Sequence, residues 1–178
     1  MQAPEVDTNA VRQQYRYELL TWPEINEAVR QQKVVVLPIG SVEQHGWHLP
    51  LDVDFRLASS VCLGAGRLAP EDILVMPPVN YGYCHHVMDF PGTVTIEPTT
   101  FVRFLMDITR SVAYHGFKQI IPHQWAWLES SSRRAGRATN ESSDRRDLLY
   151  ALVVATDRGK VEHGNPYLHH ARRMRACL

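Results

Sequence analysis

Apolar residues occur in three short runs that read as buried strands. Residues 34–39, VVVLPI, form a continuous β-branched run of the kind that parallel sheets bury on both faces. Residues 73–79, ILVMPPV, predict a second strand closed by two prolines, and FKQII, residues 117–121, begins a third. Each run is short enough to be a strand rather than a helix.

Helical periodicity fills the intervals between these runs. Thr21 precedes a predicted helix, TWPEINEAVRQQ, with Pro23 in its first turn and Glu24 placed to complete a capping box. Residues 55–68 present one apolar face. Residues 98–114 carry apolar side chains at helical spacing before a terminating glycine. The alternation of strand and helix predicts an α/β domain with a mostly parallel sheet.

The remaining segments of this region read as irregular or short. The first dozen residues are polar and are predicted to be frayed. Residues 81–92 are predicted to form a loop, and residues 93–96 a short strand. In parallel sheets ligands bind outside the carboxyl ends of the strands. The loop that follows VVVLPI therefore lies where a site is expected.

That loop, GSVEQHGWHLPLDVD, concentrates titratable side chains. Glu43 and His45 are two residues apart, and Asp54 follows eleven residues after Glu43. Gly40 and Gly46 permit the tight turns that would bring these side chains around one centre. Carboxylates and imidazole together are ligands for Zn²⁺ or Mn²⁺. The alternative interpretation is that Asp54 caps the following helix while Glu43 and His45 are solvated loop residues.

Composition narrows the class of protein. In the 178 residues, 19 Lys and Arg balance 19 Asp and Glu, which argues against an anionic membrane or nucleic acid as partner. No apolar run approaches 18 residues, and no signal peptide is recognisable. Cys62, Cys84 and Cys177 form no CxxC pair and no disulfide framework. We expect a reduced, cytoplasmic protein.

Three blocks of the sequence resemble the creatininase (creatinine amidohydrolase) family. PIGSVEQHGWHLPLDVD resembles the family signature GS-x-EQHG-x-HLPL-x-x-D. YGYCHHVMDFPGTVTIEPTTF is similar to the family's second block, which ends in FPGT, and AYHGFKQII to its HGF helix end and following strand. The resemblance covers roughly residues 20–121, and its first block is specific.

The resemblance implies a fold, an activity and a set of site residues. The implied fold is a three-layer α/β/α sandwich, and the implied activity is hydrolysis of cyclic amides or formamides through a metal-bound water at a two-metal Zn²⁺ or Mn²⁺ centre. Glu43 resembles the ligand of one metal, His45 the ligand of the other, and Asp54 the bridge. His48 resembles a residue behind the ligands, and His86 either lines the pocket or is structural. The implied partners are a small amide substrate and further copies of the chain in a closed homo-oligomer.

The family pattern breaks after the third predicted strand. The family continues NGHGGN, with a further histidine ligand, whereas this chain reads PHQWAWLES. Possible codons for residues 123–130, read one base later, permit INGHGSN. Nine of the sixteen arginines also fall within residues 122–178. The hypothesis is a frame shift near Pro122, giving a family domain over residues 1–121, C-terminally incomplete, and a foreign or divergent, poorly ordered tail over residues 122–178.

Two further interpretations remain open. The chain could be an inactive, truncated remnant of the family. If the tail is instead a genuine divergence, its basic residues could form a solvated basic surface or, at most, a phosphate-binding patch. A nucleic-acid-associated protein that uses this basic tail would be a different class of function. Those residues are Arg133, Arg134, Arg137, Arg145 and Arg146.

Overall fold

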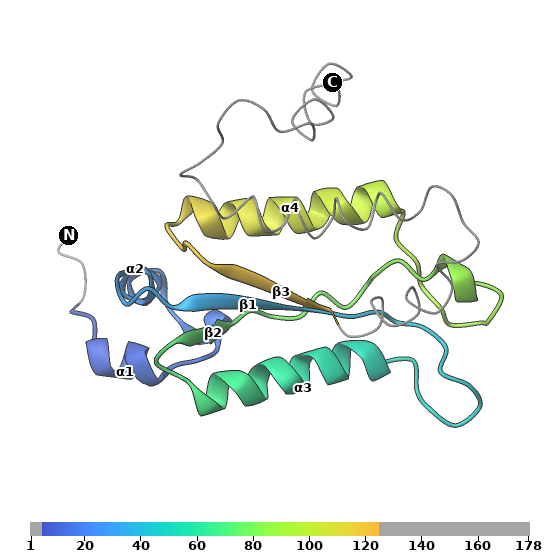
Figure 1. The fold of residues 1–178 in the computed structure, drawn as a ribbon, viewed down its shortest axis with the longest axis horizontal. Helices are drawn as coiled ribbons and strands as arrows, with labels where there is room; N and C mark the ends of the chain where they lie inside the picture. The colour runs from blue at the N-terminus through green and yellow to red at the C-terminus, as the bar shows by residue number, and fades with distance from the viewer. Residues whose placement is uncertain (1–4, 125–178) are drawn as a thin grey trace, which may run out of the picture.

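The computed structural model describes residues 5–124, which form a three-stranded parallel sheet covered by helices (Figure 1). The helices and strands, in chain order, are α1 (Thr8–Gln13), α2 (Trp22–Arg30), β1 (Val34–Ile39), α3 (Val53–Leu68), β2 (Ile73–Val75), α4 (Pro98–Tyr114) and β3 (Ile120–Gln124). Short 3₁₀ turns span Tyr17–Leu19 and His85–Val87. The strand order is β2-β1-β3, and both pairings are parallel.

The sheet lies between two long helices. Figure 1 shows α3 on one face and α4 on the other, which gives three layers. Leu37 and Ile39 of β1 pack with Phe101 and Leu105 of α4 in one buried cluster. The helix α3 lies on the opposite face of the sheet, and its buried residues include Ala58 and Cys62. The α/β fold with a parallel sheet, predicted from the sequence, is confirmed, and within residues 5–124 no helix is both long enough and apolar enough to span a bilayer.

Two predicted strands are shorter than the sequence pattern indicated. β2 ends at Val75 rather than at Val79. The carbonyl oxygen of Val36 accepts from the N–H of Met76, so Val36 faces β2. The next residue of β1 that faces β2 is Pro38, which has no N–H with which to continue the ladder. Residues 93–96 make one antiparallel bridge, Val42 with Val94, instead of the short strand that was predicted.

The prediction of a frayed N-terminus was wrong for residues 5–12, and residues 1–4 lie outside the described part. α1 is capped by Asp7, whose side chain accepts from the N–H groups of Asn9 and Ala10. Val11 of α1 is fully buried in the core between α2, α4 and the sheet. Beyond α1, Tyr15 accepts a hydrogen bond of 2.7 Å from the N–H of Val75, so this segment covers the outer edge of β2. Fraying was predicted from polarity alone, whereas tertiary contacts hold the segment in place.

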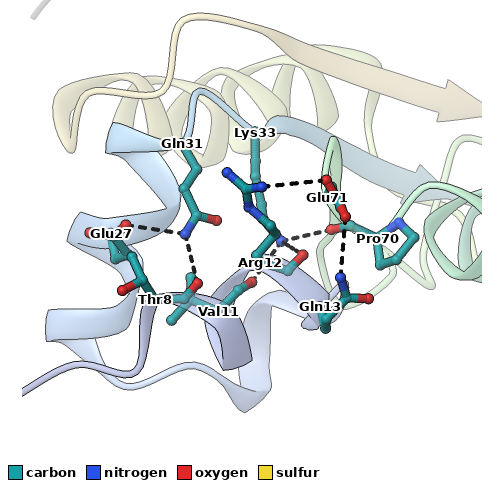
Figure 2. Close-up of polar contacts among 9 residues, drawn as sticks. All are labelled: Thr8, Val11, Arg12, Gln13, Glu27, Gln31, Lys33, Pro70 and Glu71. Atoms are coloured by element: carbon teal, nitrogen blue, oxygen red, sulfur yellow. Dashed lines mark hydrogen bonds and ion pairs between the residues drawn. The ribbon is translucent and has the colours of Figure 1, made fainter.

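A buried lysine holds α1 against the body of the domain. Lys33 is 1% exposed, and its Nζ donates to the carbonyl oxygens of Val11, Arg12, Gln14 and Pro70 at 2.7–3.0 Å. Figure 2 shows the ammonium between the end of α1 and the Pro70 turn. Burial lowers the pKa of Lys33 to about 8, so the group is still mostly protonated at pH 7. A cation here satisfies the unpaired carbonyls at the end of a six-residue helix.

Replacing Lys33 by methionine keeps the side-chain length and removes the donor. We expect Lys33→Met to lower the free energy of unfolding by about 3 kcal/mol, because buried carbonyl oxygens lose their partner. Urea unfolding of the full chain measures this. The matched control is Lys118→Met, since Lys118 is exposed. Equal stability of the two variants would contradict the structural role of Lys33.

Candidate metal centre

The site begins where β1 meets the first turn of α3. A Cβ on Gly40 would lie 2.3 Å from the Cα of Phe55, so only glycine allows this approach. The loop 81–92 also approaches this point closely, because a Cβ on Gly82 would lie 3.0 Å from the carbonyl oxygen of Gly40. Strand end, helix start and loop are therefore in direct contact at Gly40.

This approach brings together the three predicted ligands. One ligand atom from each of Glu43, His45 and Asp54 lies within 4.8 Å of the others. The Nε2 of His45 lies 3.2 Å from Oδ1 of Asp54, and its Nδ1 lies 3.0 Å from the carbonyl oxygen of Glu43. Two carboxylates and one imidazole at this separation match the donor set and spacing of a Zn²⁺ or Mn²⁺ site.

Asp54 is the buried member of the group. It is 2% exposed and lies inside the first turn of α3, whose N-cap position is occupied by Asp52. Its carboxylate hydrogen-bonds to the Ser41 hydroxyl and faces His45. The alternative interpretation of Asp54 as a helix cap is therefore wrong. The helix N-terminus favours the charged carboxylate, and a cation would offset the cost of burying it.

The second block that resembles the family, residues 81–101, contacts the loop 40–54, which carries the proposed ligands. The Thr93 hydroxyl oxygen accepts from the N–H of Gln44 at 3.3 Å, and Val42 accepts from the N–H of Val94 at 3.0 Å. These contacts fix the backbone on both sides of Glu43. In the sequence the two blocks are linked only by their resemblance to one family, whereas in the structure they touch.

Two polar residues of the site were not singled out from the sequence. The Ser41 hydroxyl donates to Oδ2 of Asp54 at 2.6 Å, and both side chains are buried. The side chain of Cys84 is fully buried, and its backbone N–H donates to the Thr95 hydroxyl oxygen at 2.9 Å. Burial raises the pKa of Cys84 to about 12, and Glu43 acts in the same direction. Their position inside the two resembling blocks, GSVE and YGYC, was the available signal.

The other predicted site residues lie apart from this group. His48 and His86 are both exposed and are not members of the three-residue cluster. Their predicted places behind the ligands and in the pocket stay predictions. Of the tail, residues 122–124 belong to β3, and residues 125–178, with the basic residues between 133 and 146, lie outside the described part.

Comparison with known proteins points to one family. Residues 18–125 match the family model described as creatininase, creatinine amidohydrolase. The creatinine amidohydrolase of Pseudomonas putida is 36% identical over 109 residues, which is 57% of this chain and 41% of that protein. The mycofactocin precursor peptide peptidase of Mycolicibacterium smegmatis is 42% identical over 84 residues, 45% of this chain and 34% of the relative.

Solved creatininase structures share the fold. A structure titled "Creatininase Mn" superposes with a TM-score of 0.60 at 30% identity, covering 78% of this chain and 54% of that one. A Zn-Zn form of a creatininase variant gives a TM-score of 0.59 at 25% identity, covering 92% and 54%. The chain thus spans about half the length of these structures and less of the two relatives.

The close approach at Gly40 can be tested with two glycines. Gly40→Ala should lower the free energy of unfolding by about 1–3 kcal/mol, because its Cβ would overlap the backbone of Phe55. Gly64→Ala is the matched control in α3, where a Cβ meets nothing within 4 Å and a gain of about 0.5–1 kcal/mol is expected. Thermal or urea unfolding measures both. A neutral Gly40→Ala would show that strand and helix do not meet as described.

Proposed function

Because the chain belongs to the creatininase family, we propose that it carries the metal site of a hydrolase acting on C–N bonds of cyclic amides or formamides. The observation that supports this is the convergence of Glu43, His45 and Asp54 beyond the carboxyl end of β1. That end of a parallel strand is where α/β folds place their ligands. In this proposal the three side chains are both the metal ligands and the catalytic residues.

The proposed metal is Zn²⁺ or Mn²⁺. Both appear in the titles of the similar creatininase structures, and the donor atoms here fit either ion. A bound ion would supply a water of lowered pKa and polarise the substrate carbonyl. Asp54 would bridge two ions, with Glu43 on one and His45 on the other. The hydrogen bonds to Asp54 hold its carboxylate toward His45 before any ion binds.

The proposed substrate is a small amide. The relatives are named for hydrolysis of creatinine and of a peptide precursor, and a third, from Thermotoga maritima, for hydrolysis of 3-dehydro-scyllo-inosose. Creatinine and a peptide both contain an amide C–N bond, whereas the inosose contains no nitrogen. The C–N bond of an amide is therefore proposed from the first two relatives. We also propose a closed homo-oligomer. A reducing, cytoplasmic setting is proposed as well, in keeping with the free thiols of Cys62 and Cys84.

A second candidate is an inactive remnant of that enzyme, and two residues of β3 favour it. The N–H of Val35 donates to Gln119, so residues 119, 121 and 123 turn their backbone groups toward β1 and Pro122 turns away. Proline there lacks the N–H that a further strand on that side would need. Among the described residues, His123 also has a buried Nε2 without a hydrogen-bond partner. Pro122 and His123 both lie at the point where the sequence departs from the family motif.

Substitution of Asp54 tests whether Glu43, His45 and Asp54 bind a metal or are only polar residues of a loop. Asp54→Asn removes one charged ligand at almost constant volume and should weaken Zn²⁺ binding by more than about 100-fold. This loss exceeds the one usually seen when a residue that only hydrogen-bonds to a metal ligand is removed. Asp52→Asn is the control, since Asp52 lies two residues earlier and pairs with Arg56. Zinc titration of the full chain against a competing chelator measures both. Equal affinity of the two variants would contradict the proposed ligand set.

The codons that encode residues 115–135 decide between the two candidates. A frame shift predicts that reading one base later gives Asn-Gly-His-Gly and remains open beyond codon 178. Sequencing the nucleic acid from fresh template measures this. The active enzyme would then be the protein in the corrected frame, and this chain its remnant. Codons that cannot encode the motif would exclude the shift and make the tail a genuine divergence.

A further inference from the structure

The N-terminal strap, defined as residues 5–16, lies across the outer edge of β2. Figure 1 shows α1 beside the end at which β1 begins, whereas the candidate metal centre lies beyond the other end of that strand. We propose that the proton on Lys33 controls this strap: protonation of Lys33 favours an open strap, and loss of the proton at alkaline pH favours a closed one. This inference does not depend on the proposed metal site.

Backbone pairing and side-chain packing hold the strap against the body of the domain. The N–H of Val75 donates to the carbonyl oxygen of Tyr15 at 2.7 Å, and the adjacent residue Arg16 forms a parallel bridge with Val75. Val11 is fully buried, and a Cβ on Gly66 would lie 2.9 Å from the ring of Tyr15. Opening of the strap would break these contacts and leave the edge of β2 free to pair with another strand.

Lys33 is buried against the strap without a counter-ion. It is 1% exposed, and within residues 5–124 it makes no ion pair. The acceptors of its Nζ are neutral backbone carbonyl oxygens, those of Val11, Arg12, Gln14 and Pro70. All but the last belong to the strap, so opening would return the ammonium to water. Burial of an ammonium beside neutral partners disfavours its charged form.

Burial is the largest influence on the Lys33 ammonium, and it lowers the pKa of Lys33 to about 8 from its usual 10.5. Asp72 and Glu71, in the turn before β2, act in the opposite direction, and Arg12 adds to the lowering of the pKa. The Glu27 carboxylate of α2 already accepts hydrogen bonds from side chains at the end of its own helix. The acidic groups near Lys33 therefore reduce the effect of burial without cancelling it.

A closed strap binds the Lys33 proton more weakly than an open one. In the open state Lys33 is solvated and takes its usual pKa of 10.5, whereas burial lowers the pKa to about 8 in the closed state. The closed strap therefore gains stability as the pH rises from about 8 to about 10.5, and it loses that gain as the pH falls back through about 8. Linkage between the two pKa values predicts that the open fraction falls about 10-fold between pH 7 and pH 9.

Trypsin cleavage after Arg12 measures opening of the strap in the full chain, because the protease acts on the opened segment. Each rate is divided by the rate for a free peptide of residues 8–20, which removes the pH dependence of trypsin itself. We expect the normalised rate to fall about 10-fold from pH 7 to pH 9. The control Lys33→Met has no ammonium at this position and should change less than about twofold over the same range. It keeps the amino terminus and every other group that titrates, so it isolates Lys33.

A normalised rate that stays constant or rises from pH 7 to pH 9 in the unchanged chain would overturn the inference. The same pH profile in Lys33→Met would also overturn it, because another group would then be responsible. Cleavage after Arg110 in α4 reports unfolding of the whole domain. If its normalised rate equals the rate after Arg12, the strap opens only with the whole domain, and the proposed device does not exist.

If Lys33→Met does not fold, NMR titration of the Lys33 side chain in the unchanged chain takes its place. A titration midpoint at a pH of about 8 supports the inference. A midpoint at about 10 or above, the usual range for a solvated lysine, overturns it.

Discussion

The absence of a side chain at Gly40 is the constraint on which the candidate centre depends. It lets the end of β1 touch the backbone of Phe55 in the first turn of α3. The approach places Asp54 inside the protein and turns the following loop so that Glu43 and His45 meet it. The same small residue allows the loop 81–92 to pack over Gly40. A single small residue thus joins a strand, a helix and a loop into one site.

Burying a carboxylate in this way requires compensation, and the structure supplies part of it. Asp54 receives a hydrogen bond from Ser41, faces His45, and lies at the positive end of α3. Two carboxylates within a few ångströms of each other still favour a cation between them. At the other end of β1, the buried ammonium of Lys33 donates to carbonyl oxygens at the end of α1 and at Pro70. Both ends of β1 are therefore organised by buried charge.

The sequence predicted most of the fold because its local signals agreed with each other. The capping box at Thr21 and the limits of α4 came directly from residue order, and β1 matches VVVLPI residue by residue. α1 escaped prediction because its hydrogen bonds to Lys33, which lies 19–22 positions further along the chain, and the packing of Val11 in the core are tertiary contacts that local polarity does not reveal. β2 was overestimated because the effect of Pro38 acts across the ladder. The ligands came from spacing and resemblance, whereas Ser41 and Cys84 needed the packing of two loops.

Anomalous diffraction at the zinc absorption edge tests most directly whether Glu43, His45 and Asp54 hold a metal ion. Crystals of the full chain grown with ZnCl₂ should show an anomalous peak about 2 Å from an oxygen of Asp54 and from the ring nitrogen of His45 or an oxygen of Glu43. A second peak across Asp54 would support the two-ion centre. Zinc found only at exposed histidines such as His48 or His86, with none beside Asp54, would contradict the account.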